Sequence, residues 1–167
     1  MNIQEKLKKV TQYVNPTLTY MYDDWNRFNK RISKLEKADT VEVLGVAKLP
    51  GVFVLLQASG RFHLKNGNLR DYPDLQIVFL RDALKDFDGL CNDTLIEEMK
   101  SLAIEWVLAY NTSGLFEPLP EDIFYSPIYE MLADRVTGVM LSIRAEELIG
   151  GCWRLPEPEE PEENVDD

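Results

Sequence analysis

Few side chains in this sequence have the type and surroundings that catalysis requires. His63 is the single histidine, and it lies in the run RFHLKNG. A histidine acts as a general base beside a nucleophile or an orienting acid, and the sequence alone identifies neither. Ser59 in QASGR lacks the G-x-S-x-G pattern of a nucleophile elbow. We therefore predict no catalytic residue, and an enzyme built on His63 and nearby acids is the last-ranked hypothesis.

Metal and cofactor motifs are also missing. The chain holds no H-E-x-x-H, C-x-x-C or P-loop pattern. Cys91 and Cys152 are far apart, and we interpret both as small apolar residues in a reducing compartment. Three acid pairs could bind a divalent cation, but none has EF-hand spacing and solvated charge is the favoured interpretation. These pairs are Asp23 with Asp24, Asp86 with Asp88, and Glu97 with Glu98. We predict no metal and no cofactor.

Charge is distributed unevenly along the chain. The formal net charge is −11, and residues 155–167 hold seven acids, three prolines and no base. The remaining 22 acids and 18 bases form no basic stripe, so we predict no direct contact with nucleic acid. Residues 155–167 should form an extended, disordered acidic tail, which is either a solubilising end or an interaction segment.

Length and hydropathy predict a single domain over residues 1–154. A chain of 167 residues, 45% of them hydrophobic, can bury a sizeable core without disulfides or metals. It has no run of about 18 apolar residues, and its lysine-bearing start lacks the apolar stretch of a secretory signal. We therefore expect no membrane partner and no secretion.

The first 37 residues carry the clearest helical pattern. Pro16 interrupts it, and Asn15 just before is a favourable N-cap. We predict one helix over about 2–14 and a longer one over 16–37, with a single kinked helix as the alternative. The apolar residues that recur every three or four positions are Ile3, Leu7, Val10, Val14, Leu18, Met21, Trp25, Phe28, Ile32 and Leu35.

Strand patterns and a second helix follow. Residues 40–81 predict three antiparallel strands, with a hairpin tip at 65–68 and a turn through DYPD at 71–74. The strands are Thr40–Ala47, the run from Val52 to Leu64, and Leu75–Arg81. A helix over 93–111 is predicted by Leu95, Met99, Leu102, Trp106 and Tyr110.

Residues 123–147 predict two more strands. Pro127 restricts the first, over 123–132, to a sheet edge, a bent strand or an extended arm. The second strand alternates, so one face should lie under the helices, near Trp25 and Trp106, and the other should face solvent or a neighbouring subunit. The first face is Val139, Leu141, Ile143 and Ala145; the second is Met140, Ser142, Arg144 and Glu146.

This order of elements predicts an α+β domain. A mainly antiparallel sheet of four to five strands should carry two long helices packed on one face. The 62–70 hairpin and the 123–132 arm are devices that cover a sheet edge or reach a neighbouring copy. The residues that we assign to such an interface are His63, Asn66, Asn68, Arg70, Tyr125, Tyr129, Met140 and Arg144.

The same order, ending in FYSPIYEMLADRVTGVMLSIRAEEL, resembles the small tail-terminator or tail-completion (neck) proteins of long-tailed bacteriophages. In that family the last part often runs as a strand, an Asp-containing connection, and a strand that begins near a glycine. The corresponding parts here are Tyr125–Leu132, Asp134 and Gly138–Ala145. The resemblance is one of topology and covers about residues 1–150, so the acidic tail lies outside it.

The resemblance implies a virion structural protein without catalysis. Members of the family form a ring, commonly of six subunits, that caps the tail tube and presents a surface to the head connector. The implied partners are further copies of the chain, the tail tube and the head-connector proteins. The implied location is the virion, or the cytoplasm of the bacterial host during assembly. A small cytosolic adaptor or inhibitor that binds its partner through the acidic tail is the alternative.

Overall fold

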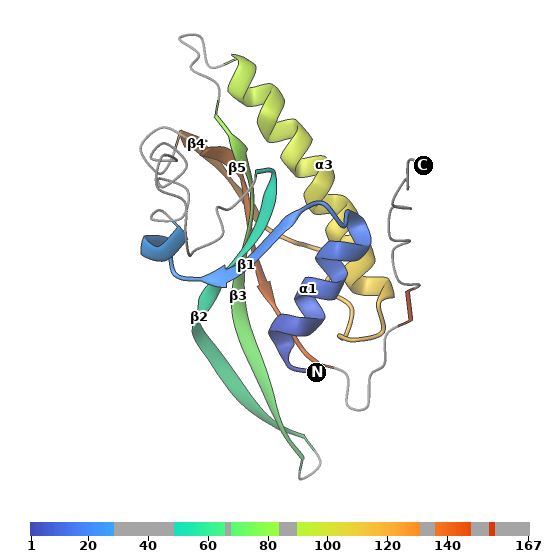
Figure 1. Ribbon diagram of the computed structural model, residues 1–167. Coiled ribbons are helices and arrows are strands. Elements are labelled where there is room, and N and C mark those ends of the chain that lie inside the picture. Colours follow the sequence, from blue (N-terminus) through green and yellow to red (C-terminus); the bar gives the residue numbers. More distant parts are fainter. Residues whose placement is uncertain (29–48, 66–67, 84–89, 131–135, 148–153, 156–167) are drawn as a thin grey trace, which may run out of the picture.

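The computed structural model describes residues 1–28, 49–65, 68–83, 90–130, 136–147 and 154–155 (Figure 1). The predicted strand Thr40–Ala47, most of the predicted helix over 16–37, and the acidic tail after Leu155 lie outside these ranges. Asn66, Asp86, Asp88 and Cys152 also lie outside them.

The described residues form a mainly antiparallel five-stranded sheet, in the order β1-β2-β3-β5-β4, with two helices. β1 runs parallel to β2, and every other neighbouring pair is antiparallel. The predicted α+β class is therefore confirmed. The elements are α1 (Ile3–Val14), β1 (Thr19–Asp23), β2 (Gly51–Lys65), β3 (Asn68–Asp82), α3 (Leu90–Thr112), β4 (Tyr125–Glu130) and β5 (Val136–Arg144).

Both helices lie on one face of the sheet (Figure 1) and enclose the main core. α1 begins with a capping box, in which Asn2 and Glu5 each accept the backbone N–H of the other. Trp106 of α3 is fully buried, packs edge-on against Phe79 of β3, and donates its indole N–H to Thr11 of α1. Val139, Leu141 and Ile143 of β5, and Ala145 just after it, belong to this core, as predicted.

The prediction of a helix from residue 16 is wrong at residues 19–23. Asn15 is the C-cap of α1, and its side chain accepts the backbone N–H of Thr17 at 2.9 Å. Thr19–Asp23 then pairs with Gly51–Leu55 as strand β1. Tyr20 faces the helix-side core and Met21 the opposite face, which is the alternation of a strand. The apolar spacing around Leu18 and Met21 fits either structure over so few residues.

A second, smaller core covers the sheet face opposite the helices. Residues 25–28 form a helical turn, and Phe28 of this turn packs edge-on against Phe53 of β2. Trp25 packs against this second core, so the prediction that Trp25 lies near the helix-covered face of β5 is wrong. The buried members are Met21, Phe28, Phe53, Leu55, Val78, Leu80, Ile128 and Val136.

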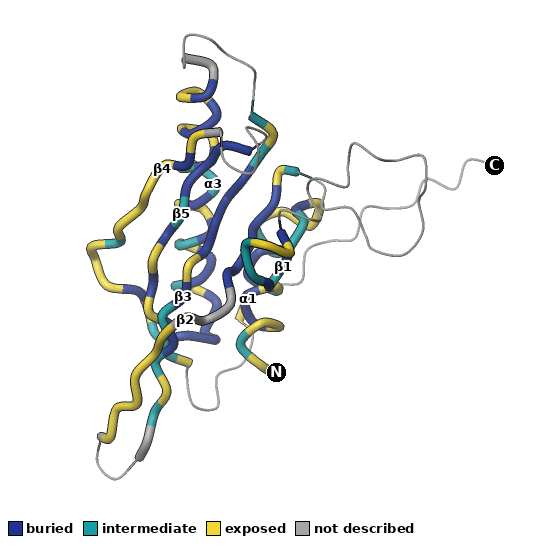
Figure 2. Tube along the Cα trace, turned by 90° about the vertical axis from the view of Figure 1, so that its left-hand side faces the viewer, coloured by how far each residue is buried: buried dark blue, intermediate teal, exposed yellow. Residues whose placement is uncertain are grey.

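β2 and β3 continue past the rest of the sheet as a long hairpin, whose described strands are largely exposed in Figure 2. The predicted turn through DYPD is wrong, because residues 71–74 are part of β3. Pro73 is tolerated there because β5 pairs with β3 only from Asp74 onward. Pro127 lies in β4, the last strand in the order of the described sheet, so of the three alternatives predicted for it (edge strand, bent strand or extended arm) the structure has the edge strand.

Candidate functional site

The hairpin carries a polar cluster on the sheet face opposite the helices. His63 pairs with Arg70 in register and packs edge-on against Tyr72, at 5.9 Å between ring centroids. Tyr72 donates its hydroxyl to Glu146 at 2.8 Å, which raises the pKa of Tyr72. Arg70 forms an ion pair with the same carboxylate. The predicted interface residues His63 and Arg70 thus meet on one face, and Arg70 ties the hairpin to the end of β5.

The opposite face of the hairpin carries two exposed apolar side chains beside Asp71, and the described helices do not cover it. Phe62 is 73% exposed and Leu64 is 67% exposed. Strand alternation places both on the side of the sheet that α1 and α3 cover elsewhere. The hairpin therefore extends the core-facing side of the sheet beyond its helices.

The β4 edge positions Tyr125 and Tyr129 beside α3. Lys100 of α3 lies 5.0 Å from the ring centroid of Tyr125, and the Tyr129 hydroxyl donates to Asp93 at 2.8 Å. Both tyrosines nevertheless remain half exposed. These two predicted interface residues therefore lie together, away from the hairpin.

An apolar groove of about 220 Å³ opens between α3 and β4. Its floor includes Leu141 of β5, and among the described residues that line it Lys100 alone is charged. Ile104 and Leu108, one helical turn apart, remain about 60% exposed at this groove. We call this feature the α3–β4 groove; the residues that define its walls are Ile104, Val107, Leu108, Ile123 and Tyr125.

Met140 and Arg144, the last predicted interface residues, lie on the sheet face opposite the helices. Met140 is half buried against the second core. Arg144 is exposed, and its Nε donates to Oδ1 of Asp74 at 2.7 Å, while the other carboxylate oxygen, Oδ2, accepts a hydrogen bond from the Ser59 hydroxyl. These contacts lower the pKa of Asp74 below its usual value.

Replacing Arg144 by glutamine is expected to raise the pKa of Asp74 toward its usual value. A depressed carboxylate pKa stabilises the fold above the unfolded-state pKa, and this stabilisation is lost as the pH falls through the folded-state pKa. NMR titration of Asp74 measures the shift directly. The urea midpoints of the wild type and Arg144→Gln should differ near pH 7 and approach each other as the pH falls through the folded-state pKa of Asp74; Ser142→Ala, on the same exposed strand face, is the control. An unchanged Asp74 pKa would contradict the pairing.

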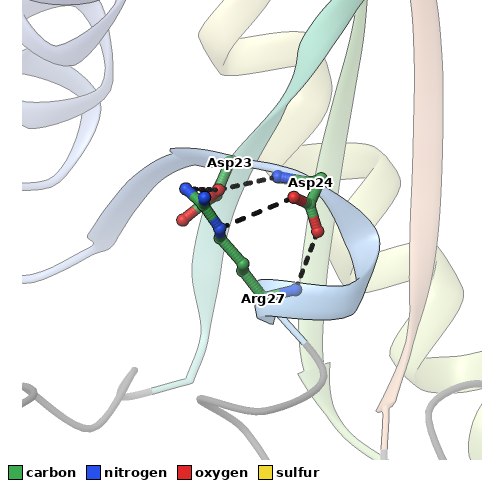
Figure 3. A network of polar contacts seen from close by, with 3 residues as sticks. All are labelled: Asp23, Asp24 and Arg27. Atoms are coloured by element: carbon green, nitrogen blue, oxygen red, sulfur yellow. Dashed lines mark hydrogen bonds and ion pairs between the residues drawn. The ribbon is translucent and has the colours of Figure 1, made fainter.

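The acid pair Asp23–Asp24 caps the helical turn over 25–28 (Figure 3). Asp24 accepts the backbone N–H of Arg27 at 2.9 Å, and the Arg27 guanidinium contacts both carboxylates. Glu97 and Glu98 pair with Lys100 and Arg81. Over the described ranges, no group of three or more His, Cys, Asp or Glu side chains is arranged to hold a metal ion.

The exposed apolar residues were missed by the interpretation of the sequence. Ile104 and Leu108 of α3, and Phe124 before β4, are all at least 60% exposed. A signal for the first two was present, because residues 102–109 of α3 are apolar at every position except Glu105. Apolar residues outside the buried stripe of a helix indicate a second apolar surface that another element or another chain can cover.

Comparison of the chain with protein-family models and with curated proteins gave no match. Neither α1 nor α3, the two long helices that the structure describes, has the length and apolar character needed to span a membrane.

Proposed function

We propose that this chain is a structural protein of a phage or prophage virion, which caps the tail tube by self-assembly into a ring. The observation that carries this proposal is the presence of two different uncovered apolar surfaces on one chain. One is the hairpin face with Phe62 and Leu64, and the other is the α3–β4 groove. A monomer gains nothing from either surface, whereas an assembly can bury both.

The sheet edge at β4 adds to the case. Among the strands that the structure describes, β4 pairs only with β5 and is the last in the order. An uncapped edge strand presents backbone donors and acceptors to another chain. Tyr125 and Tyr129 lie half exposed on it, and tyrosine is enriched at protein interfaces.

The tail-tube role itself is supported by the topological resemblance to tail-terminator and neck proteins. The segments that carry the resemblance, at 125–132 and 138–145, overlap the adjacent strands β4 and β5. These strands are also the wall and floor of the groove. The partners on this proposal are further copies of the chain, the tail tube and the head connector.

Native mass spectrometry and light scattering of the full chain test the assembly. We expect a closed ring of several subunits, visible by negative-stain electron microscopy, and expect it to halt growth of the tube protein of the same phage. A chain that stays monomeric at high concentration would overturn the ring. A ring that leaves tube growth unaffected would overturn the capping role.

A further inference from the structure

We infer that the hairpin of one copy inserts Phe62 and Leu64 into the α3–β4 groove of the next copy. This inference rests on the proposed ring and specifies which two surfaces meet in it. The contact is head-to-tail, because each chain donates its hairpin and receives another at a different place. Repetition of such a contact closes into a ring when the rotation per subunit allows it.

The hairpin has the shape of an inserted segment. Among the described strands it is a two-stranded ribbon beyond Leu55 and Asp74, since β1 pairs with β2 only over Gly51–Leu55 and β5 pairs with β3 only from Asp74. Isolated ribbons are marginally stable in water and gain from a second layer. Phe62 and Leu64 point from one face of this ribbon, and the Tyr72–Glu146 contact anchors its other face.

The groove has matching chemistry. The described residues of its walls and floor are almost entirely apolar, and Ile104 and Leu108 are exposed at it. Apolar side chains from a ribbon would cover both residues. The hairpin cannot reach the groove of its own chain, because in Figure 1 it projects past the end of the sheet, away from β4.

Net charge favours the encounter of the same two segments. Residues 59–71, which make up most of the hairpin, hold three bases, one histidine and one acid. By register Arg61 and Arg70 lie on the face opposite Phe62, and Asp71 lies beside Phe62, so the charge acts on the approach of the two copies rather than inside the groove. Residues 90–125, which supply α3 and the groove's second wall, hold seven acids and one base. Opposite net charges speed the encounter and disfavour groove-to-groove contact between copies. An acidic partner protein fits the basic hairpin but not the acidic surroundings of the groove.

Disulfide trapping in the full chain tests the contact directly. In a background with Cys91→Ser and Cys152→Ser, a chain carrying Leu64→Cys is mixed with a chain carrying Leu108→Cys and oxidised. We expect a covalent heterodimer within assembled rings. Ser101→Cys is the matched control, because Ser101 is exposed on the same helix but does not line the groove. Equal trapping at Ser101 and Leu108 would overturn the assignment to the groove.

A second measurement uses the double variant Phe62→Ser/Leu64→Ser, with Phe124→Ser as its control. Phe124 is 79% exposed but lines a hollow with Asp74 and Arg144 on the other face of the sheet. The double variant should keep the urea midpoint of the wild type and weaken ring assembly by at least about tenfold. Phe124→Ser should leave assembly unchanged.

The outcomes separate this inference from the proposed function. A ring that survives Phe62→Ser/Leu64→Ser overturns the hairpin contact and leaves ring assembly standing. A ring lost in that variant, but without trapping at Leu108, places the hairpin on another surface and overturns the groove assignment. A wild-type chain that is monomeric at every concentration overturns the ring and this inference together.

Discussion

Replacing Gly138 by alanine is expected to destabilise the protein by at least about 3 kcal/mol, more than overpacking usually costs. A Cβ at this position would lie 1.9 Å from the carbonyl oxygen of Phe79 in β3. That oxygen belongs to the backbone, so the clash is relieved only by parting β3 from β5. Gly138 also pairs with Ile128 of β4, so the movement would displace the wall of the groove.

Urea unfolding monitored by circular dichroism measures this effect. Ser142→Ala is the matched control, because Ser142 is exposed on the same strand, and it should change the unfolding free energy by no more than about 0.5 kcal/mol. A Gly138→Ala variant that unfolds at the wild-type urea concentration would show that β3 and β5 do not approach as closely as described.

Replacing Trp106 by alanine is expected to cost about 3–5 kcal/mol, the usual effect of removing a large buried aromatic side chain. Trp106 is fully buried and contacts the rings of Phe79 and Tyr110. Its indole N–H also donates to the Thr11 hydroxyl at 3.0 Å, and that hydroxyl donates in turn to the Leu7 carbonyl. The substitution therefore removes packing and the polar link between α1 and α3.

A double-mutant cycle separates these two contributions. Thr11→Val leaves the buried indole N–H without its acceptor and should cost about 1–3 kcal/mol. In the presence of Trp106→Phe the same change should cost clearly less, because no donor is left unpaired. Equal costs of Thr11→Val in both backgrounds would show that the hydrogen bond contributes nothing to the link between the helices.

Local patterns identified the elements whose periodicity extends over several turns or alternations. α3 covers the predicted 93–111 and begins three residues earlier, and α1 was predicted to within a residue. The alternation of β5 correctly separated its helix-covered side from the opposite face. Pro127 indicated the sheet edge because proline cannot donate a ladder hydrogen bond.

β1 shows where such patterns stop being decisive. Its five residues, TYMYD, fit a helical stripe and a strand equally well, and tyrosine favours strands. The strand conformation of these residues is favoured by pairing in parallel with β2, which lies at least 28 positions further along the chain. The same pairing moved Trp25 to the second core, because the chain leaves β1 on the face opposite the helices.

The proposed interface divides in the same way. The hairpin residues and the two tyrosines of β4 were assigned to it from turn chemistry, polarity and the position of Pro127, all of which are local properties. The groove could not be assigned in this way, because Ile104 and Leu108 look like any apolar residues of a core helix. Their exposure depends on how far β4 extends over α3. The residue types of the chain determined which segments can form strands and helices. Only the packing of α3 against β4 and β5 decided which apolar side chains stay exposed, because burial depends on the arrangement of segments that are distant in the sequence.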